Sequence, residues 1–215
     1  LAKYSFPSGA LIGDIGSNDG TCLQFFKEKG FNVLGVDPAT EIAARATAQG
    51  ILTVAEFFSE KVGKNILEQY GQAHLITSHN TCAHVDDLVD LVRGVRNWLH
   101  DDGLFVCEVG YLLDVYNNNW FDTIYHEHLD YHSVKPLVSF FNSLDMELIS
   151  VERISPQGGS IRLYVQKDNG PYKKDSSVQE IVQLEENLGL DNVEIFSAFN
   201  DRNNANKEVL TSILR

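Results

Sequence analysis

The chain has 215 residues, of which 43% are hydrophobic and 22% are charged, a balance typical of a soluble globular protein. Its formal net charge of −13 repels phosphate backbones and anionic lipid surfaces, which argues against a nucleic-acid or membrane partner. The three cysteines lack CxxC spacing, so they predict buried free thiols and neither a zinc site nor a disulfide framework. Because no signal peptide or apolar span is visible, we expect a cytoplasmic protein.

The order of the predicted elements indicates a doubly wound α/β sheet. Short β-rich runs alternate with helical runs, which is typical of parallel βα units. We expect strands at residues 11–15, 31–37, 51–54, 73–78 and 104–109, and helices at 21–29, 40–49, 86–99 and 134–144. A turn is expected at 101–103, and residues 111–133 predict no regular element.

The last part of the chain changes this pattern. Residues 146–154 and 160–167 read as two strands joined by a short Gly- and Pro-containing loop, which predicts an antiparallel hairpin. Five βα units closed by a hairpin match the seven-stranded, Rossmann-like class I methyltransferase sheet. We therefore expect one domain over residues 1–170, followed by a polar helical tail over 171–215 that begins a truncated C-terminal domain.

The first βα turn, Asp14 to Gly20, carries the pattern Asp-x-Gly-x-x-x-Gly, at the position where a doubly wound sheet binds its ligand. Dinucleotide sites use Gly-x-Gly-x-x-Gly around a pyrophosphate. Here Asn18 replaces the middle glycine, and Asp19 would repel a pyrophosphate. A carboxylate at this position does not repel S-adenosylmethionine (SAM), because SAM carries a positively charged sulfonium and ammonium. The turn therefore predicts SAM in preference to NAD.

Two further segments extend this predicted cofactor site. Asp37 ends the second strand, where an acidic side chain accepts ribose hydroxyls in both NAD and SAM sites. Glu56 to Phe58 follow the third strand and could form an aromatic wall for adenine. The predicted cofactor-binding residues are Asp14, Gly16, Ser17, Asn18, Gly20, Asp37, Pro38, Glu56, Phe57, Phe58 and Asn80.

The segment Tyr125 to His132 is the richest cluster of reactive side chains. Histidine titrates near neutral pH and can remove a proton, and tyrosine can donate a hydrogen bond to a developing enolate oxygen. These residues suit proton abstraction next to a carbonyl, although O-methylation would also need a base. A zinc site in this segment would need a third ligand, and none has a clear spacing, so we expect no metal. The remaining alternative to a catalytic role is a solvated polar loop.

Five motifs, at residues 14–20, 35–39, 83–88, 123–129 and 158–162, resemble the nucleotide-sugar C-methyltransferases. That family methylates dTDP-4-keto-sugars at C3, and the resemblance covers its central SAM-binding domain, over about the first 170 residues. The family usually has an N-terminal zinc-binding region and a C-terminal α/β domain, and we expect neither within these 215 residues. It also has Gln157 where the family tends to have His.

The resemblance implies roles for the matching residues. His128 would be the base that takes the C3 proton, and Tyr125 and Glu127 would help to hold the substrate and the enolate. Asn80 would lie near SAM and the sugar. The implied substrate contacts are His84, Glu108, Tyr111 and His126. The leading hypothesis is therefore SAM-dependent C-methylation of a nucleotide-linked keto-sugar, with a small-molecule O- or N-methyltransferase or a non-catalytic SAM-binding domain as alternatives.

Overall fold

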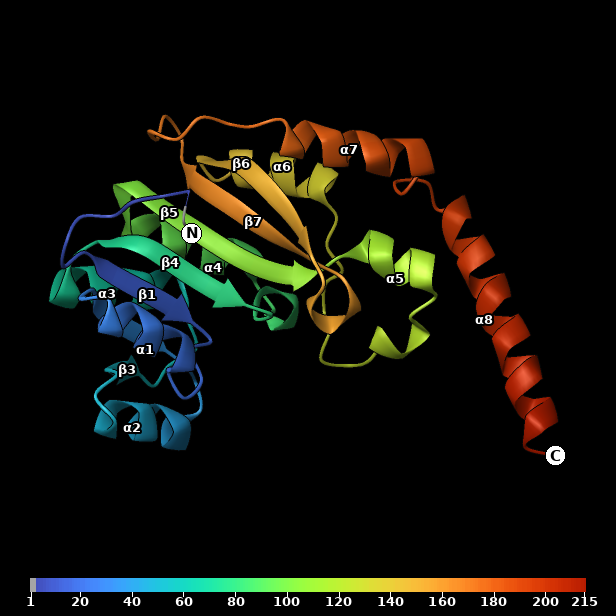
Figure 1. Cartoon of the computed structure of the whole chain (residues 1–215), viewed down its shortest axis with the longest axis horizontal. Helices are drawn as coiled ribbons and strands as arrows, with labels where there is room; N and C mark the ends of the chain where they lie inside the picture. The colour runs from blue at the N-terminus through green and yellow to red at the C-terminus, as the bar shows by residue number, and fades with distance from the viewer. Residues whose placement is uncertain (1–2) are drawn as a thin grey trace.

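One seven-stranded sheet forms the centre of the protein (Figure 1). The structure, a computed structural model, describes residues 3–215, and its strand order is β3-β2-β1-β4-β5-β7-β6. Strands β1 to β5 pair in parallel, whereas β7 runs antiparallel to both β5 and β6. The predicted sheet and its terminal hairpin are confirmed. The strands are β1 (Leu11–Ile15), β2 (Asn32–Val36), β3 (Thr53–Val54), β4 (Ala73–His79), β5 (Leu99–Gly110), β6 (Met146–Ile154) and β7 (Ser160–Lys167).

Helices cover both faces of this sheet because each face of the parallel strands is apolar. One core contains buried side chains of α3, α4, α6 and α7, and the opposite core contains those of α1 and α2. The helices are α1 (Thr21–Glu28), α2 (Thr40–Ala48), α3 (Glu60–Tyr70), α4 (Leu88–Trp98), α5 (Leu112–Asn118), α6 (Val134–Asn142), α7 (Ser177–Leu188) and α8 (Glu194–Ile213), with short 3₁₀ turns η1 (Cys82–His84), η2 (Phe121–Thr123) and η3 (Pro156–Gly158).

Helix α3 was not among the predicted elements. Its N-cap is Ser59, whose hydroxyl accepts a hydrogen bond from the amide of Val62 at 3.2 Å. The helix packs closely on α4, because a Cβ on Gly63 would collide with the backbone of Gly94. The N-cap serine and the glycine at position 71 are the sequence signals that could have revealed this helix.

The structure also differs from the predictions at β5 and in the segment that follows it. Strand β5 begins at Leu99, whereas the sequence predicted its start at residue 104. The expected turn at 101–103 lies inside this strand, where the register with β4 shifts: Ala73 pairs with Leu99, and Leu75 pairs with Leu104. Within residues 111–133, α5 and η2 form, so the prediction of no regular element was wrong there. Helix α5 is too short for its periodicity to be recognised, and Asn119 ends it in the left-handed region at φ 55°.

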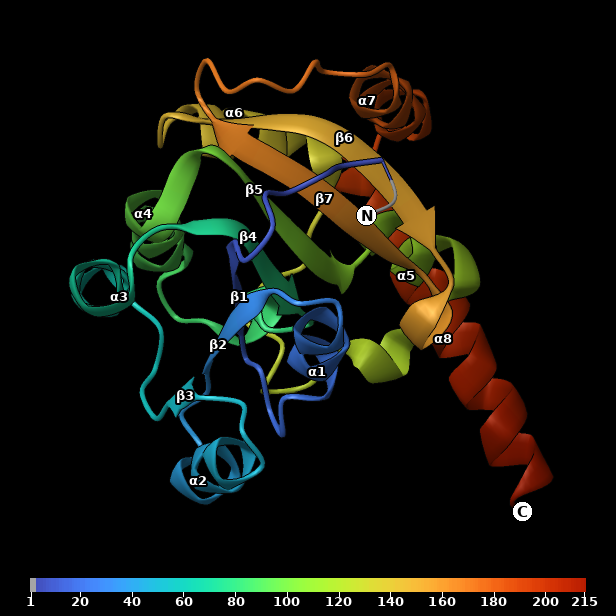
Figure 2. The same ribbon diagram turned by 60° about the vertical axis from the view of Figure 1, so that its left-hand side comes forward.

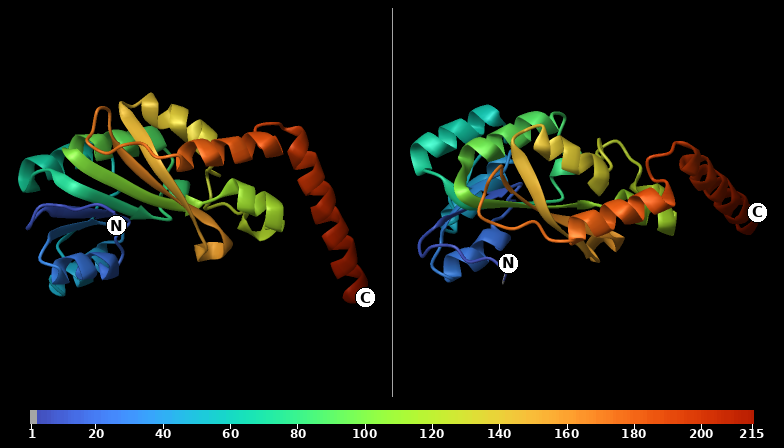
Figure 3. Two further views of the ribbon diagram at one scale, coloured as in Figure 1. Left: turned by 45° about the horizontal axis from the view of Figure 1, so that its top comes forward. Right: turned by 90° about the horizontal axis from the view of Figure 1, so that it is seen from above.

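The helical tail divides into two parts (Figures 2 and 3). Helix α7 packs on β6 and α6, and its Val178 and Ile181 belong to the main core. Helix α8 extends away from the sheet, and most of its side chains are exposed. None of the helices in residues 3–215 is both long and apolar enough to cross a lipid bilayer.

All three cysteines are free. Cys82 and Cys107 are buried, as predicted, whereas Cys22 is partly exposed. The carboxyl ends of β1, β2, β4 and β5 lie at one edge of the sheet because these strands are parallel, and this edge carries the candidate site.

Candidate active site

The turn between β1 and α1 depends on backbone conformations that favour glycine. Gly16, Asn18 and Gly20 all have positive φ angles, of 74°, 51° and 81°. A Cβ on Gly16 would collide with the Thr81 side chain, and one on Gly20 would lie 2.8 Å from Cγ2 of Ile51. Both glycines are therefore required by close tertiary contacts as well as by the turn itself.

Asp37 ties the end of β2 to this turn. One carboxylate oxygen accepts a hydrogen bond from the amide of Asn18 and the other from the amide of Ala39, each at 2.9 Å. Each oxygen retains a second lone pair for another donor, such as a ribose hydroxyl. Ser17 is buried, and its hydroxyl lies against Gly35, so its side chain points away from the expected ligand.

Asp19 occupies the N-terminal end of α1. Its carboxylate accepts hydrogen bonds from the amide of Thr21 at 3.1 Å and from the Thr21 hydroxyl at 2.7 Å. These bonds lower the pKa of Asp19, with the hydroxyl bond as the larger cause. A dinucleotide pyrophosphate would use this helix terminus, so a negative carboxylate already bound there disfavours such a ligand.

A groove of about 390 Å³ lies beside the turn, which is a size typical of small-ligand sites. We call it the cofactor groove. It contains six of the predicted site residues, namely Gly16, Pro38, Glu56, Phe57, Phe58 and His84. The remaining lining residues are Ile15, Val36, Ser59, Thr81, Val85, Asp86, Asp87, Asp90 and Leu91.

The cofactor groove is more acidic than the predicted site residues indicate, since Glu56 was the only one of its acidic residues among them. Glu56, Asp86, Asp87 and Asp90 all contribute to its wall. Several carboxylates in one cleft attract cations and repel phosphates. Asp86 and Asp87 belong to the motif at 83–88, so their pairing was the available sequence signal. The charge of the groove thus favours a cationic ligand over a dinucleotide.

The two phenylalanines of the predicted aromatic wall have different environments. The Phe57 side chain is 82% exposed, so it is free to cover a flat ligand. Phe58 is half-buried, and its ring lies 6.1 Å from the ring of Trp98 in the main core. Phe57 is therefore available for ligand contact, whereas Phe58 also supports the fold.

Asp14 lies near the carboxyl end of β1, at the edge of the sheet that carries the site. It is buried and accepts a hydrogen bond from the Thr77 hydroxyl at 2.7 Å, and its carboxylate raises the pKa of His79 through a hydrogen bond. Potential metal-ligand atoms of Asp14, Cys22 and His79 all lie within 4.8 Å of one another. Burial raises the pKa of Cys22 to about 11, so this thiol is protonated at neutral pH when no metal is bound.

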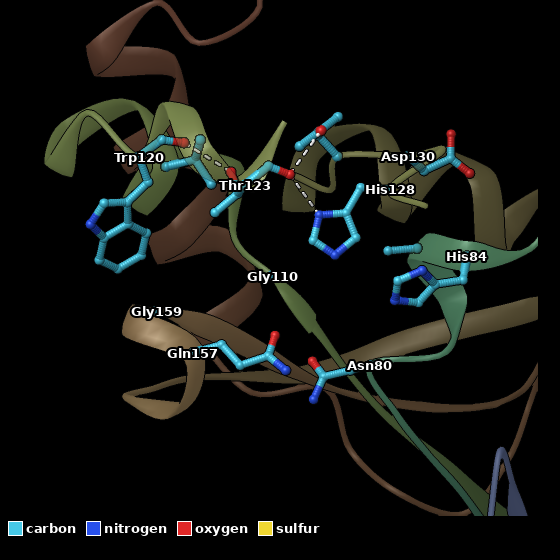
Figure 4. A pocket seen from close by; sticks show the side chains of 12 residues that line it. Asn80, His84, Gly110, Trp120, Thr123, His128, Asp130, Gln157 and Gly159 are labelled. Atoms are coloured by element: carbon cyan, nitrogen blue, oxygen red, sulfur yellow. Dashed lines mark hydrogen bonds between the residues drawn. The ribbon is translucent and has the colours of Figure 1, made fainter. Parts of the chain in front are cut away.

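A second cavity, which we call the histidine pocket, lies beside the cofactor groove (Figure 4). His84 lines both, so the two sites meet at its ring. Figure 4 shows Asn80 and Gln157 on the side of the pocket opposite His128. The lining residues are Asn80, Ala83, His84, Gly110, Val115, Trp120, Thr123, His128, Asp130, Tyr131, Gln157 and Gly159.

Both pocket histidines are held through one ring nitrogen. Nδ1 of His128 lies 2.8 Å from the carbonyl oxygen of Thr123, and Nδ1 of His84 lies 2.7 Å from that of Glu127. A carbonyl can only accept, so each Nδ1 donates. In the neutral rings Nε2 is therefore unprotonated, and it is the basic nitrogen of each side chain.

Tyr125 completes this arrangement. Its hydroxyl lies 3.3 Å from Nε2 of His128 and therefore donates to that nitrogen, and the two ring centroids are 4.4 Å apart. The Tyr131 hydroxyl donates to the carbonyl of Thr123 at 3.2 Å, so this carbonyl accepts hydrogen bonds from two side chains. The predicted pair Tyr125 and His128 is thus brought together in a form suited to proton transfer.

Tyr125 is 43% exposed and does not line the histidine pocket itself, and two other predicted residues of this segment also lie outside it. The side chains of His126 and Glu127 are 88% and 62% exposed, and neither lines the cavity. Glu127 contributes to the pocket through its backbone carbonyl, which holds His84. The chain turns here, with the amide of His128 bonded to the carbonyl of Tyr125.

Glu108 and Tyr111 also have partners that the sequence did not reveal. Glu108 is buried at the end of β5 and forms an ion pair with Arg162, with Oε1 2.6 Å from Nε of the arginine. Tyr111 is fully buried, and its hydroxyl donates to Glu185 of α7 at 2.9 Å. Neither side chain lines the histidine pocket in this structure.

The loop before β7 closes the pocket from the other side. Gln157 is in the left-handed region at φ 53°. A Cβ on Gly158 would collide with the Trp120 ring, and one on Gly159 would collide with the Asp114 carboxylate. These glycines let the loop pack against the 111–133 segment. Trp120, Thr123, Asp130 and Tyr131 were not predicted as site residues, although the aromatic composition of that segment was a signal.

Comparison with known proteins identifies the family. A family model described as a methyltransferase domain matches residues 1–151, which is most of the chain. The chain belongs to the methyltransferase family. A second model, described as the C-methyltransferase C-terminal domain, matches residues 155–215.

A curated relative and several solved structures agree with this assignment. C-methyltransferase NovU of Streptomyces niveus is 33% identical over 190 residues, which are 88% of this chain and 45% of NovU, so the chain spans less than half of that relative. The fold resembles a SAM-dependent methyltransferase from Anabaena variabilis (TM-score 0.59, 14% identity, 75% and 79% of the two chains). It also resembles the plantazolicin methyltransferase BpumL in complex with SAH (TM-score 0.56, 12% identity, 74% and 76%).

These matches confirm the resemblance to C-methyltransferases that the motifs predicted. They also confirm SAM as the cofactor of this methyltransferase domain. The residues of the cofactor groove fit that molecule. Its acidic wall suits the sulfonium and ammonium groups, Asp37 retains acceptor capacity for the ribose, and Phe57 is free to cover the adenine.

Proposed function

We propose that this chain forms the catalytic part of a C-methyltransferase that acts on a nucleotide-linked keto-sugar. The observation that carries this proposal is the contact of 3.3 Å between the Tyr125 hydroxyl and Nε2 of His128, with Nδ1 of His128 bonded to a carbonyl. A neutral imidazole with one basic nitrogen is suited to abstraction of a proton next to a carbonyl group. The motifs at 123–129 and 158–162, and the relative NovU, support C-methylation.

The proposed reaction begins when the Tyr125 hydroxyl turns its hydrogen bond from Nε2 of His128 to the carbonyl oxygen of the bound 4-keto-sugar, which frees Nε2 to take the proton from C3. The electron pair of that C–H bond moves into an enolate, whose oxygen Tyr125 stabilises by donating a hydrogen bond. SAM, when bound, supplies an electrophilic methyl group. The enolate carbon forms a bond to this methyl group as the bond from the methyl group to sulfur breaks, and the sulfur keeps the electron pair of the broken bond. His128 then passes its proton to solvent.

The boundary between the two cavities supports a direct transfer. His84 belongs to both, and its ring lies 5.0 Å from that of His128. We propose that His84 and Asn80 contact the acceptor next to the donor methyl group. The carbonyl of Glu127 keeps the His84 ring in this position. Gln157 and Trp120 also suit a sugar, because the Gln157 amide offers hydrogen bonds to hydroxyl groups and the Trp120 ring offers an apolar face.

The domain organisation belongs to the same proposal. Residues 1–170 form the donor and acceptor sites, and residues 171–215 begin the C-terminal domain that helps to hold the nucleotide. The cytoplasmic location expected from the sequence stays a prediction.

Calorimetric titration with S-adenosylhomocysteine (SAH) tests the cofactor half of the proposal. We expect saturable binding to the folded chain, and Gly16→Ala to weaken it. Circular dichroism establishes that both proteins are folded. Absence of heat from the folded wild-type chain would contradict the assignment of the cofactor groove.

Deuterium exchange at C3 of a dTDP-4-keto-deoxysugar tests the acceptor half. In D₂O we expect wash-in with the wild-type chain and none above the uncatalysed rate with His128→Ala. The matched control is His126→Ala, which removes an exposed histidine two residues away. Unchanged wash-in in His128→Ala would remove His128 as the base. Mass spectrometry that locates the new methyl group on oxygen or nitrogen would favour the alternative acceptor class.

A further inference from the structure

Glu185 of α7 is an acidic side chain buried in the core, at 2% exposure. Its Oε1 accepts hydrogen bonds from the Tyr111 hydroxyl at 2.9 Å and from the amide of Val134 at 2.6 Å. Its Oε2 accepts one from the amide of Lys135 at 2.8 Å. A buried carboxylate requires such partners, because its desolvation is otherwise costly.

The amides that bind Glu185 are the first two of α6. This helix begins after Ser133, whose side chain makes no capping bond. The first amides of a helix lack intrahelical acceptors and carry partial positive charge, so a carboxylate is stabilising there. Glu185 therefore acts as the N-cap of α6 from a distant part of the chain.

These contacts lie at both ends of one segment. Tyr111 directly precedes residues 112–132, and Val134 follows them after one residue. The two ends also pair with each other, because the amide of Leu112 donates to the carbonyl of His132 at 2.9 Å. A single carboxylate on α7 thus joins the start and the end of this segment.

The segment supplies half of the histidine pocket, namely Val115, Trp120, Thr123, His128, Asp130 and Tyr131. Its middle part has little core of its own, since Phe121, Ile124, Tyr125 and Leu129 are exposed. The amide of Leu129 bonds to the carbonyl of Ala83, which attaches the segment to η1. A weakly packed segment takes its position mainly from where its ends are fixed.

We propose that Glu185 is a positioning residue for the histidine pocket, and that α7 sets the place of Tyr125 and His128 through it. This inference rests on the proposed function for the identity of the acceptor, but not for the geometry. Because the cofactor groove is built from other elements, loss of Glu185 affects the acceptor side selectively. Small misplacement of catalytic groups lowers turnover strongly.

The test compares Glu185→Gln with Glu186→Gln in the full chain. The side-chain amide introduced at position 185 can replace only one of the two carboxylate oxygens, so its NH₂ group then faces the backbone amide of Lys135 or of Val134. Glu186 is a matched control, because it is adjacent and forms a surface ion pair with Lys135 at 2.9 Å. Hydrogen exchange followed by mass spectrometry, SAH calorimetry and turnover of a dTDP-4-keto-deoxysugar are measured for each protein.

For Glu185→Gln we expect hydrogen exchange in residues 119–131 to rise roughly tenfold, since one hydrogen bond to a charged group is lost. We expect kcat for the acceptor to fall by roughly tenfold or more. The SAH dissociation constant should stay within about twofold of the wild-type value, as expected for a distant site. Glu186→Gln should resemble the wild type in all three measurements.

Unchanged exchange in 119–131, or a loss of SAH affinity as large as the loss of turnover, overturns the inference. Should Glu185→Gln fail to fold, Tyr111→Phe removes only the hydroxyl bond and is held to the same criteria. Exchange and SAH binding need no acceptor. Faster exchange in the variant combined with no turnover by the wild type would therefore contradict the proposed function and leave the positioning role supported.

Discussion

The Tyr125 hydroxyl lies 3.3 Å from Nε2 of His128, the one nitrogen of that ring left basic by the bond to Thr123. The two residues are three positions apart, and a turn of the backbone brings their rings together. The bond to Thr123 defines the basic nitrogen, and the Tyr125 contact places a donor beside it. The proposed reaction depends on this pair.

Tyr125→Phe tests the role of the hydroxyl. We expect kcat to fall roughly 10- to 100-fold, because a hydrogen-bond donor to the developing oxyanion is lost. The SAH dissociation constant should not change. Tyr131→Phe is the control, since that hydroxyl donates to the Thr123 carbonyl at 3.2 Å and not to Nε2. A loss of kcat in Tyr131→Phe as large as that in Tyr125→Phe, measured by steady-state kinetics, would contradict a role that is specific to the Tyr125 hydroxyl.

Gly16→Ala tests the cofactor turn, with Gly30→Ala as the control. Both glycines have positive φ, of 74° and 86°, so each alanine should lower the free energy of unfolding by about 1–2 kcal/mol. Only at Gly16 does the new Cβ collide with a neighbour, the Thr81 side chain, whereas the space at Gly30 is open. We expect calorimetry to show weaker SAH binding in Gly16→Ala alone. Equal affinities would contradict the tight packing of the turn.

The two adjacent phenylalanines should respond differently to truncation. Phe57→Ala should change the free energy of unfolding by less than about 0.5 kcal/mol, because the ring is 82% exposed. It should weaken SAH binding roughly tenfold if the ring covers the adenine. Phe58→Ala should lower stability by about 2 kcal/mol, because its ring packs on Trp98. Urea denaturation and calorimetry separate these effects, and the reverse pattern would contradict the assignment of Phe57.

His132 should make stability depend on pH. Burial lowers the pKa of this histidine, and its Nε2 has no hydrogen-bond partner among residues 3–215. The unfolded chain binds a proton below pH of about 6.5, whereas the folded protein resists it. The free energy of unfolding should therefore decrease as the pH falls below that value.

Denaturant unfolding at pH 7.5 and pH 5.5 measures this dependence. His132→Asn should reduce the difference between the two conditions, and His126→Ala should leave it unchanged, because His126 is exposed. A wild-type difference that persists in His132→Asn would assign the pH dependence to other groups.

Local sequence patterns predicted all seven strands, most of the helices, the sheet with its terminal hairpin, and the cofactor. These features depend on residues close together in the chain. The apolar periodicity of β1, β4 and α4 is local, and so is the turn from Asp14 to Gly20, whose acidic and amide side chains disfavour a dinucleotide. Helix α3 had local signals in Ser59 and Gly71 that apolar periodicity alone did not reveal.

Which side chains face the histidine pocket depends on contacts between distant parts of the chain. Residues 125–128 were recognised as reactive, but the directions of their side chains depend on a turn of the backbone and on hydrogen bonds between the segment and η1. Tyr111 is oriented by Glu185, 74 residues later. Such a contact leaves no local pattern, since it depends on how α7 packs over the sheet. The composition of the segment indicated chemistry, and long-range packing determined its geometry.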